Sequence, residues 1–150
     1  MKLFISILVL CFIFGFSCDE GEEGNCPLKS LDIKTGQVCG CGGSDSLSIT
    51  EIKANYTFAN PCDATQNEVS ETATNQEKWN ELLAAFNWDD FTTVNVNTCN
   101  LCADGCDTWI IIQKDDMIHH IRFGDNSPEI EPIRDFIEKL DAWRQDFRQN

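Results

Sequence analysis

Basic residues are scarce in this sequence. It has only 11 Lys and Arg against 25 Asp and Glu, which gives a formal net charge of −14. Because such a chain repels phosphate groups, nucleic acid is excluded as an expected partner. The same charge disfavours adhesion to anionic lipid by electrostatics alone.

The sequence also lacks the common motifs of catalysis. It contains no glycine-rich phosphate loop, no serine nucleophile elbow and no helical pair of zinc-binding histidines. Its two histidines, His119 and His120, are adjacent in a predicted strand, so they point to opposite faces and cannot bind one metal together. We therefore expect no catalytic residue, no metal and no cofactor.

Long apolar runs are limited to one. It extends from Leu3 to Phe16, follows Lys2, and is shorter than the about 20 residues of a membrane-spanning helix. A charged start, an apolar centre and small residues at the end are typical of a secretory signal. We predict a signal peptide at residues 1–17, cleaved after Ser17, and its loss changes the net charge from −14 to −15.

Two segments follow the predicted signal. Residues 18–26, "CDEGEEGNC", are acidic and small, cannot bury enough apolar surface to fold, and should form a solvated spacer. Residues 27–150 are long enough for a single domain with its own core. No later apolar run is long enough to span a membrane.

Cysteine, in contrast, is abundant. There are nine, and this number in an exported chain predicts disulfides formed in an oxidising compartment. Six of them fall into two groups of three: Cys39, Cys41 and Cys62, then Cys99, Cys102 and Cys106. Cys39 and Cys41 are too close in sequence to bridge each other, so each is expected to pair with a distant cysteine. Bonds between the groups would tie the first strand and the following connection to the hairpin, although the exact pairing stays open.

Two other interpretations of "CNLCADGC" compete with disulfides. A redox pair of Cys99 and Cys102 would need a helix N-terminus to lower the pKa of one thiol, whereas this segment leads into a predicted strand. A metal could be bound by Cys99, Cys102 and Cys106 with Cys39 or Cys41, but the usual pair of Cys-x2-Cys knuckles is missing. Structural disulfides are favoured over both.

Hydrophobic periodicity predicts the secondary structure. A strand is expected at residues 47–58 with a bulge or break near Thr50, followed by a long connection at 60–75 that is pinned at Cys62. A helix should carry Trp79, Leu82, Leu83 and Phe86 on one side, with Thr74 or Asn75 as its cap.

The second half predicts a hairpin and a final helix. "TWIIIQK" at 108–114 and "MIHHIRF" at 117–123 flank a turn at Asp115 and Asp116. The first of these strands is apolar on both faces, so it should be central or covered by a helix. A helix should begin between Ser127 and Pro132. The predicted fold class is α+β, a small antiparallel sheet with a C-terminal β-hairpin packed against two helices.

Several segments together carry a family resemblance. "FSC" followed by "DEGEE", then "KWNELLAAFNWDDF", "CNLCADGCDTWIII" and "HHIRFG", resemble small uncharacterised surface lipoproteins of Bacteroidetes-type bacteria, which have a CxxCADG segment before a hairpin and a C-terminal helix. The resemblance implies that the signal is cut before Cys18, that Cys18 is lipidated, and that the protein is held at the outer membrane or cell surface. It implies no activity.

Lipidation is also physically reasonable. Each buried CH2 of an acyl chain contributes about 0.8 kcal/mol, so two or more chains anchor a protein stably. If Cys18 is lipidated, Cys26 is left as the odd thiol, free or paired between molecules. If it is not, Cys18 and Cys26 can close a small loop.

These observations predict a membrane-anchored lipoprotein that is not an enzyme. Its domain would bind a partner, either a protein or a small ligand, or would have a structural role in the envelope. The alternative is a soluble secreted disulfide-rich protein, such as an inhibitor or effector. A thiol-redox protein that uses Cys99 and Cys102 is less favoured.

Overall fold

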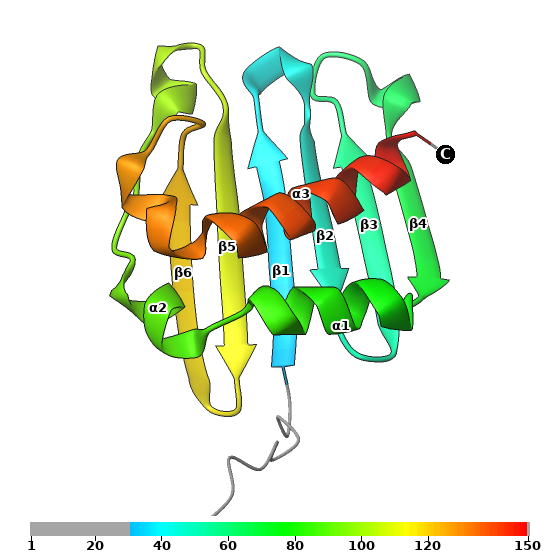
Figure 1. The fold of residues 1–150 in the computed structure, drawn as a ribbon. Helices are drawn as coiled ribbons and strands as arrows, with labels where there is room; N and C mark the ends of the chain where they lie inside the picture. Colours follow the sequence, from blue (N-terminus) through cyan, green and yellow to red (C-terminus); the bar gives the residue numbers. More distant parts are fainter. Residues whose placement is uncertain (1–30, 150) are drawn as a thin grey trace, which may run out of the picture.

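Residues 31–149 form a six-stranded antiparallel sheet with three α-helices in the computed structural model, which describes this part of the chain (Figure 1). The predicted signal, Cys18 and Cys26 lie outside the described residues. The strand order is β4-β3-β2-β1-β5-β6. The predicted α+β class, with its C-terminal hairpin, is confirmed.

Four strands, two helices, two more strands and a final helix follow one another along the described chain. The strands are β1 (Leu31–Val38), β2 (Ser44–Ile49), β3 (Lys53–Ala59), β4 (Glu68–Ala73), β5 (Asp107–Lys114) and β6 (Met117–Phe123). The helices are α1 (Gln76–Ala85), α2 (Trp88–Thr93) and α3 (Arg134–Arg148). Short 3-10 turns are η1 (Gly40–Gly42), η2 (Ala64–Gln66), η3 (Asn100–Ala103) and η4 (Pro128–Ile133).

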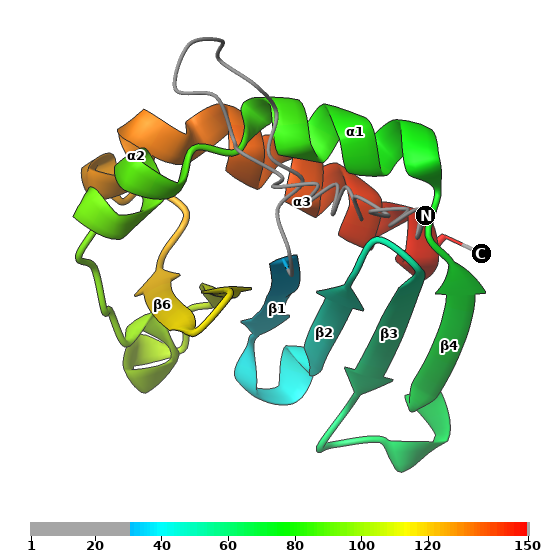
Figure 2. The same ribbon diagram turned by 90° about the horizontal axis from the view of Figure 1, so that it is seen from below.

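The core lies between one face of the sheet and the helices. Figure 2 shows α1, α2 and α3 on the same side of the strands. Alternate strand residues point to this side, because successive side chains of a strand face opposite ways. Fully buried residues come from both layers: Ile33, Leu47, Ile49, Tyr56, Ile110, Ile112 and Ile121 from the strands, and Leu82, Phe91, Phe136 and Leu140 from the helices.

Both predicted strand regions are present. The region at 47–58 breaks at Thr50, as predicted, and becomes the β2–β3 hairpin, in which the Thr50 amide donates to the Lys53 carbonyl at 2.9 Å. The second hairpin is β5–β6, with Asp115 in its turn at positive φ. Strand β5 lies between β1 and β6 and is therefore internal, as expected of a strand with two apolar faces.

Two strands were not predicted. Strand β1 occupies a central position, although its sequence "LDIKTGQV" has few apolar residues and a glycine. Strand β4 lies within the segment expected to be a connection, so that prediction is wrong for residues 68–73. It is an edge strand made mostly of exposed polar residues. Because neither of its faces is buried, its sequence lacks the alternation of apolar and polar residues by which a strand is recognised.

The helices begin and end close to their predicted limits. Asn75 caps α1, because its side chain accepts a hydrogen bond from the Lys78 amide at 3.1 Å. After α1 the chain forms the separate short helix α2, capped by Asn87. The final helix was expected to begin between Ser127 and Pro132, but the 3-10 turn η4 occupies that region and α3 begins at Arg134. None of the helices in residues 31–149 is long and apolar enough to cross a membrane.

Candidate functional site

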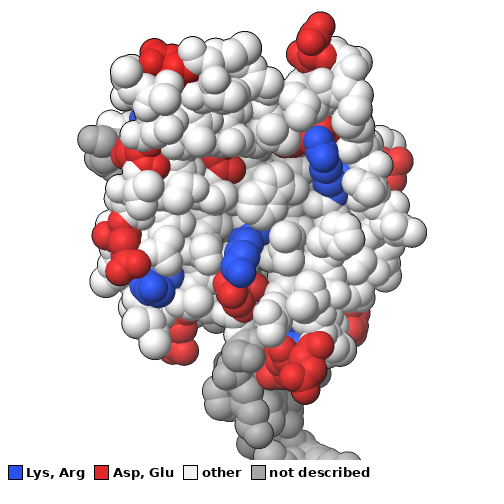
Figure 3. Space-filling view, turned by 180° about the vertical axis from the view of Figure 1, so that it is seen from behind, with Lys and Arg blue, Asp and Glu red and all other residues white. Residues whose placement is uncertain are grey.

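One face of the sheet is not covered by any described helix, and we call it the open face. Figure 3 views the molecule from this side. Strand alternation and pairing place the following side chains on it: Asp32, Lys34, Gly36, Ser46, Ser48, Lys53, Asn55, Thr57, Val69, Glu71, Trp109, Ile111, Ile118, His120 and Arg122. Val69 and Ile118 are large apolar residues that are 82% and 65% exposed.

Trp109 lies on β5, one strand from the β6 edge of the open face, next to a glycine. It pairs with Gly36 of β1, and a Cβ placed on Gly36 would lie only 2.6 Å from Cζ2 and 2.9 Å from Cε2 of the indole. The ring therefore lies across the position that a side chain would occupy at Gly36. Trp109 remains partly exposed, so the glycine supports an aromatic surface on the outside of the sheet.

Residues that lie side by side on neighbouring strands form a row across the sheet. In the row of Trp109, short hydroxyl side chains follow on β2 and β3. The register places Gly36 beside Ser46, and Ser46 beside Thr57. The hydroxyls of Ser46 and Thr57 hydrogen bond to each other at 2.8 Å. On the other side of the indole, the row ends at Arg122 of the edge strand β6.

Charged side chains on the open face are paired. Lys34 lies 3.7 Å from Asp32, and Lys53 lies 3.4 Å from Glu71. Within the described residues, every Lys and Arg of this face has a carboxylate partner, since Arg122 binds Asp107. The face is therefore close to neutral on a protein of net charge −14.

Asp107 forms a buried polar centre at one end of the open face. Its carboxylate accepts hydrogen bonds from the amides of Asn100 and Leu101 at 2.9 and 3.1 Å, and from the Thr98 hydroxyl at 3.0 Å. Arg122 donates a further bond at 2.7 Å. Burial alone would raise the pKa of Asp107, but these donors outweigh burial and hold it well below its ordinary value.

The six cysteines of the two predicted groups form three disulfides. These are Cys39–Cys106, Cys41–Cys62 and Cys99–Cys102. Cys39 and Cys41 each pair with a distant residue, as expected from their spacing. The expectation of bonds mainly between the two groups is wrong, because only Cys39–Cys106 connects them.

All three disulfides lie at one end of the sheet, which we call the crosslinked end. It contains η1, η2 and η3, and Figure 1 shows these turns at the end opposite to the start of β1. The reason is local, since Cys39 follows β1, Cys62 follows β3 and Cys106 precedes β5. Antiparallel strands bring these three positions to the same edge.

The surroundings of Cys99 and Cys102 do not favour thiol catalysis. The two are joined, and both are exposed, Cys99 directly before the turn η3 and Cys102 within it. A reactive thiolate is stabilised by backbone amides or nearby cations. Here the amides of Asn100 and Leu101 donate to the buried carboxylate of Asp107 instead, so they do not stabilise a sulfur anion. In residues 31–149, no group of three or more His, Cys, Asp or Glu is arranged to bind a metal.

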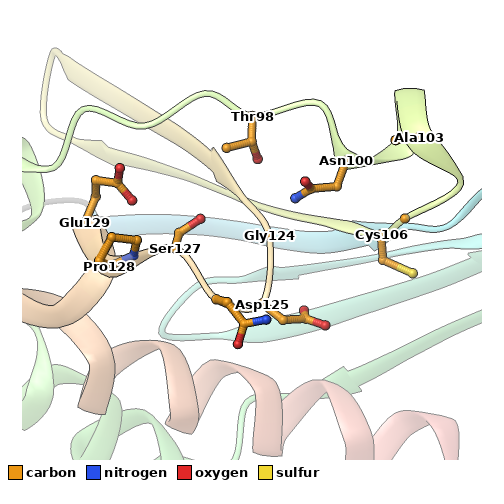
Figure 4. Close-up of a pocket in the computed structure, with 11 residues that line it drawn as sticks. Thr98, Asn100, Ala103, Cys106, Gly124, Asp125, Ser127, Pro128 and Glu129 are labelled. Atoms are coloured by element: carbon orange, nitrogen blue, oxygen red, sulfur yellow. The ribbon is translucent and has the colours of Figure 1, made fainter.

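A polar pocket lies beside the crosslinked end. It has a volume of about 530 Å³ and lies between residues 98–106 and residues 124–129. Figure 4 shows Thr98 and Asn100 on one side and Ser127 and Glu129 on the other. The side-chain amide of Asn100 lies directly against Gly124, since a Cβ placed on this glycine would be 1.9 Å from Nδ2 of Asn100. Hydroxyl, amide and carboxylate groups make this pocket suited to a small polar molecule.

The residues around Trp109 on the open face were not found by sequence reasoning. Trp109 and Ile111 were recognised only as an apolar side of a strand, and Gly36, Ser46 and Arg122 gave no signal. The pairing of a large aromatic with a glycine across two strands becomes visible only when the register is known. His119 and His120 do face opposite ways, and the ring of His119 bonds the Val94 carbonyl on the covered side at 2.9 Å.

Together these features define the class of the molecule: a disulfide-crosslinked α+β protein with one covered and one open sheet face. No known protein family matches the chain, and no curated protein does. The function is therefore argued from the open face and the sequence before the domain.

Proposed function

We propose that this protein is an exported lipoprotein, anchored through Cys18, whose domain binds a partner without catalysis. The open face is the observation that carries the proposal. It combines a partly exposed Trp109 with exposed Val69 and Ile118 and has balanced charges. Val69 lies on the edge strand β4 and Ile118 on the edge strand β6, so with Trp109 they place exposed apolar groups across the width of the face, where a partner can contact them.

The position of the chain entry supports a tethered domain. Strand β1 begins at Leu31, at the end of the sheet opposite to the crosslinked end. The residues between Cys18 and Leu31 reach about 40 Å when extended. An anchor at Cys18 would therefore be joined to the end of the domain opposite to the crosslinked end, and a spacer of this reach would leave the open face accessible.

Three disulfides agree with an exported protein, since such bonds persist in oxidising compartments. The resemblance to surface lipoproteins adds the outer membrane or cell surface as the location. In this proposal the acidic spacer separates the domain from the lipid, and the only membrane contact is the covalent lipid itself.

Intact mass of the membrane-extracted protein tests the anchor. We expect a mature chain that begins at Cys18 and carries the added mass of acyl chains. The Cys18→Ser variant, exported through the same signal, should be recovered in the soluble fraction. An unmodified mass for the natural chain would overturn the lipoprotein proposal.

A second candidate, a soluble secreted protein, is favoured by the pairing of the cysteines. Because six cysteines pair among themselves, Cys18 and Cys26 are the two left in the predicted mature chain. A disulfide between them would use every thiol and would leave no sulfur for lipid. Peptide mapping without reductant distinguishes the two candidates, since a peptide that joins Cys18 to Cys26 is compatible only with the secreted form.

A further inference from the structure

The indole of Trp109 is available for stacking. Gly36 lies against the ring, and Trp109 is partly exposed on the side of the sheet that no described helix covers. A partly exposed indole offers solvent a flat apolar surface with a polar N–H at its edge. A sugar ring is complementary to it, because its C–H groups form an apolar face and its hydroxyls form a polar rim.

Hydrogen-bonding groups follow at regular spacing from the indole. Ser46 and Thr57 continue its row, and Lys34, Ser48 and Asn55 form the neighbouring row beside Ile111. Adjacent strands lie about 4.8 Å apart, so the six strands present a polar surface about 24 Å wide. Hydroxyls and amides both donate and accept, as the hydroxyls of a sugar chain require.

The charge of the open face selects a neutral ligand. Each of its cations has a carboxylate partner, Asp32, Glu71 or Asp107, so the face carries no excess positive charge that would favour a carboxylate or a phosphate. The strongly acidic character of the whole chain opposes an anionic ligand further. A cationic ligand would find no unpaired carboxylate on this face among the described residues.

We propose that the open face binds a neutral oligosaccharide or polysaccharide chain, laid across the strands with one sugar ring stacked on Trp109. This proposal rests on the proposed binding function and names the ligand class of that face. The stacked ring fixes the position of the chain, and the hydroxyl and amide rows hold the following sugars.

The test measures binding of neutral hexasaccharides by isothermal titration calorimetry. The probes are cellohexaose, mannohexaose, maltohexaose and xylohexaose, with hexagalacturonate as the acidic counterpart. The protein is the exported full chain with Cys18→Ser, so failure of lipid anchoring does not affect the result. We expect at least one neutral probe to bind and the acidic probe to bind more weakly.

Variants locate the site on the open face. Trp109→Ala should weaken binding by about tenfold or more, because it removes the stacking surface. Trp109→Phe keeps an aromatic ring over Gly36 and should weaken binding less. The double variant Ser46→Ala with Thr57→Ala removes the neighbouring hydroxyls and should weaken binding severalfold. Met117→Ala, at the first residue of β6 and on the side of the strand opposite to Ile118, is the matched control and should bind as the natural sequence does.

Four results would overturn the proposal. The first is that no neutral probe binds with a dissociation constant below about 1 mM. The second is that folded Trp109→Ala, or the double hydroxyl variant if Trp109→Ala does not fold, binds as the natural sequence does. The third is stronger binding of hexagalacturonate than of every neutral probe. The fourth is a dimer in sedimentation equilibrium that dissociates in the Trp109 variants, which would assign the face to a second copy of this chain.

Discussion

Asp107 is a single buried residue that holds several segments of the crosslinked end together. Its carboxylate receives four hydrogen bonds from three segments, namely Thr98, the start of η3 and Arg122. Asp107→Asn keeps the shape but removes the charge that attracts these donors. We expect a loss of about 3 kcal/mol in the free energy of unfolding at pH 7, measured by urea denaturation.

The loss caused by Asp107→Asn should depend on pH in one direction. The carboxyl has a pKa near 3.9 in an unfolded chain and a lower one in the folded protein. The charged form therefore stabilises the fold above about pH 4, and this contribution disappears as the pH falls toward the folded pKa. The difference between the variant and the natural sequence should be constant from about pH 5 to 7 and should shrink below about pH 4.

Asp32→Asn is the control, because Asp32 pairs with Lys34 on the partly exposed surface. It should cost less than about 1 kcal/mol. A loss for Asp107→Asn that stays the same down to pH 2 would contradict the role given to its charge.

Among the single elements, helix α3 is held on the sheet by ion pairs as well as by its buried apolar residues. Arg144 is 3% exposed and lies 3.4 Å from the fully buried Asp45 of β2, which also binds Arg148. Asp45 in turn accepts a bond from the Gln37 amide at 2.8 Å. The carboxylate therefore joins β1, β2 and the C-terminal half of α3.

Asp45→Asn should destabilise the protein strongly. It leaves the buried Arg144 guanidinium with one carboxylate partner, that of Asp141, which lies 2.9 Å away. Burial raises the pKa of Asp141 above its ordinary value, although Arg144 acts in the opposite direction. Breaking a buried ion pair from one side costs about 3–5 kcal/mol, and we expect the urea midpoint to fall accordingly. Asp135→Asn, which removes an exposed pair with Lys139 on the same helix, should change stability by less than about 1 kcal/mol. Equal effects of the two variants would be inconsistent with this attachment.

The elements that the sequence predicts are those with a long apolar period. Trp79 and Leu82 define α1, Phe136 and Leu140 define α3, and the run around Ile110 defines the hairpin. Strands β1 and β4 lack this signal, because one contains Gly36 and the other is exposed. The contact between Asp45 and Arg144 joins residues 99 positions apart, so no local sequence pattern predicts it.

The open face could not be predicted for a related reason. Sequence alternation shows that a strand has two different sides, but it does not show which side the helices cover. Trp109 was therefore recognised as apolar without a location. The disulfide pairing was equally hidden, because spacing excludes a bond between Cys39 and Cys41 but does not choose among the remaining partners.

The three disulfides should contribute unequally to the stability of the whole molecule. Cys39–Cys106 spans 67 residues, Cys41–Cys62 spans 21 and Cys99–Cys102 spans 3. A crosslink restricts the unfolded chain more when it closes a longer loop. We expect replacement of each pair by serine to cost about 4, about 3 and less than about 2 kcal/mol, respectively, in urea denaturation.

The position of each bond strengthens this order. Cys39–Cys106 joins the end of the central strand β1 to the start of β5, so its loss also loosens the contact between the two halves of the sheet. Cys99–Cys102 lies in an exposed turn that Asp107 already holds through two amides, so the turn keeps a restraint when this bond is absent. The double variant Cys99→Ser with Cys102→Ser should therefore keep its fold and its binding at the open face. If this pair proved the most costly of the three to remove, the crosslinked end would owe its order to the short loop rather than to Asp107 and the long-range bond.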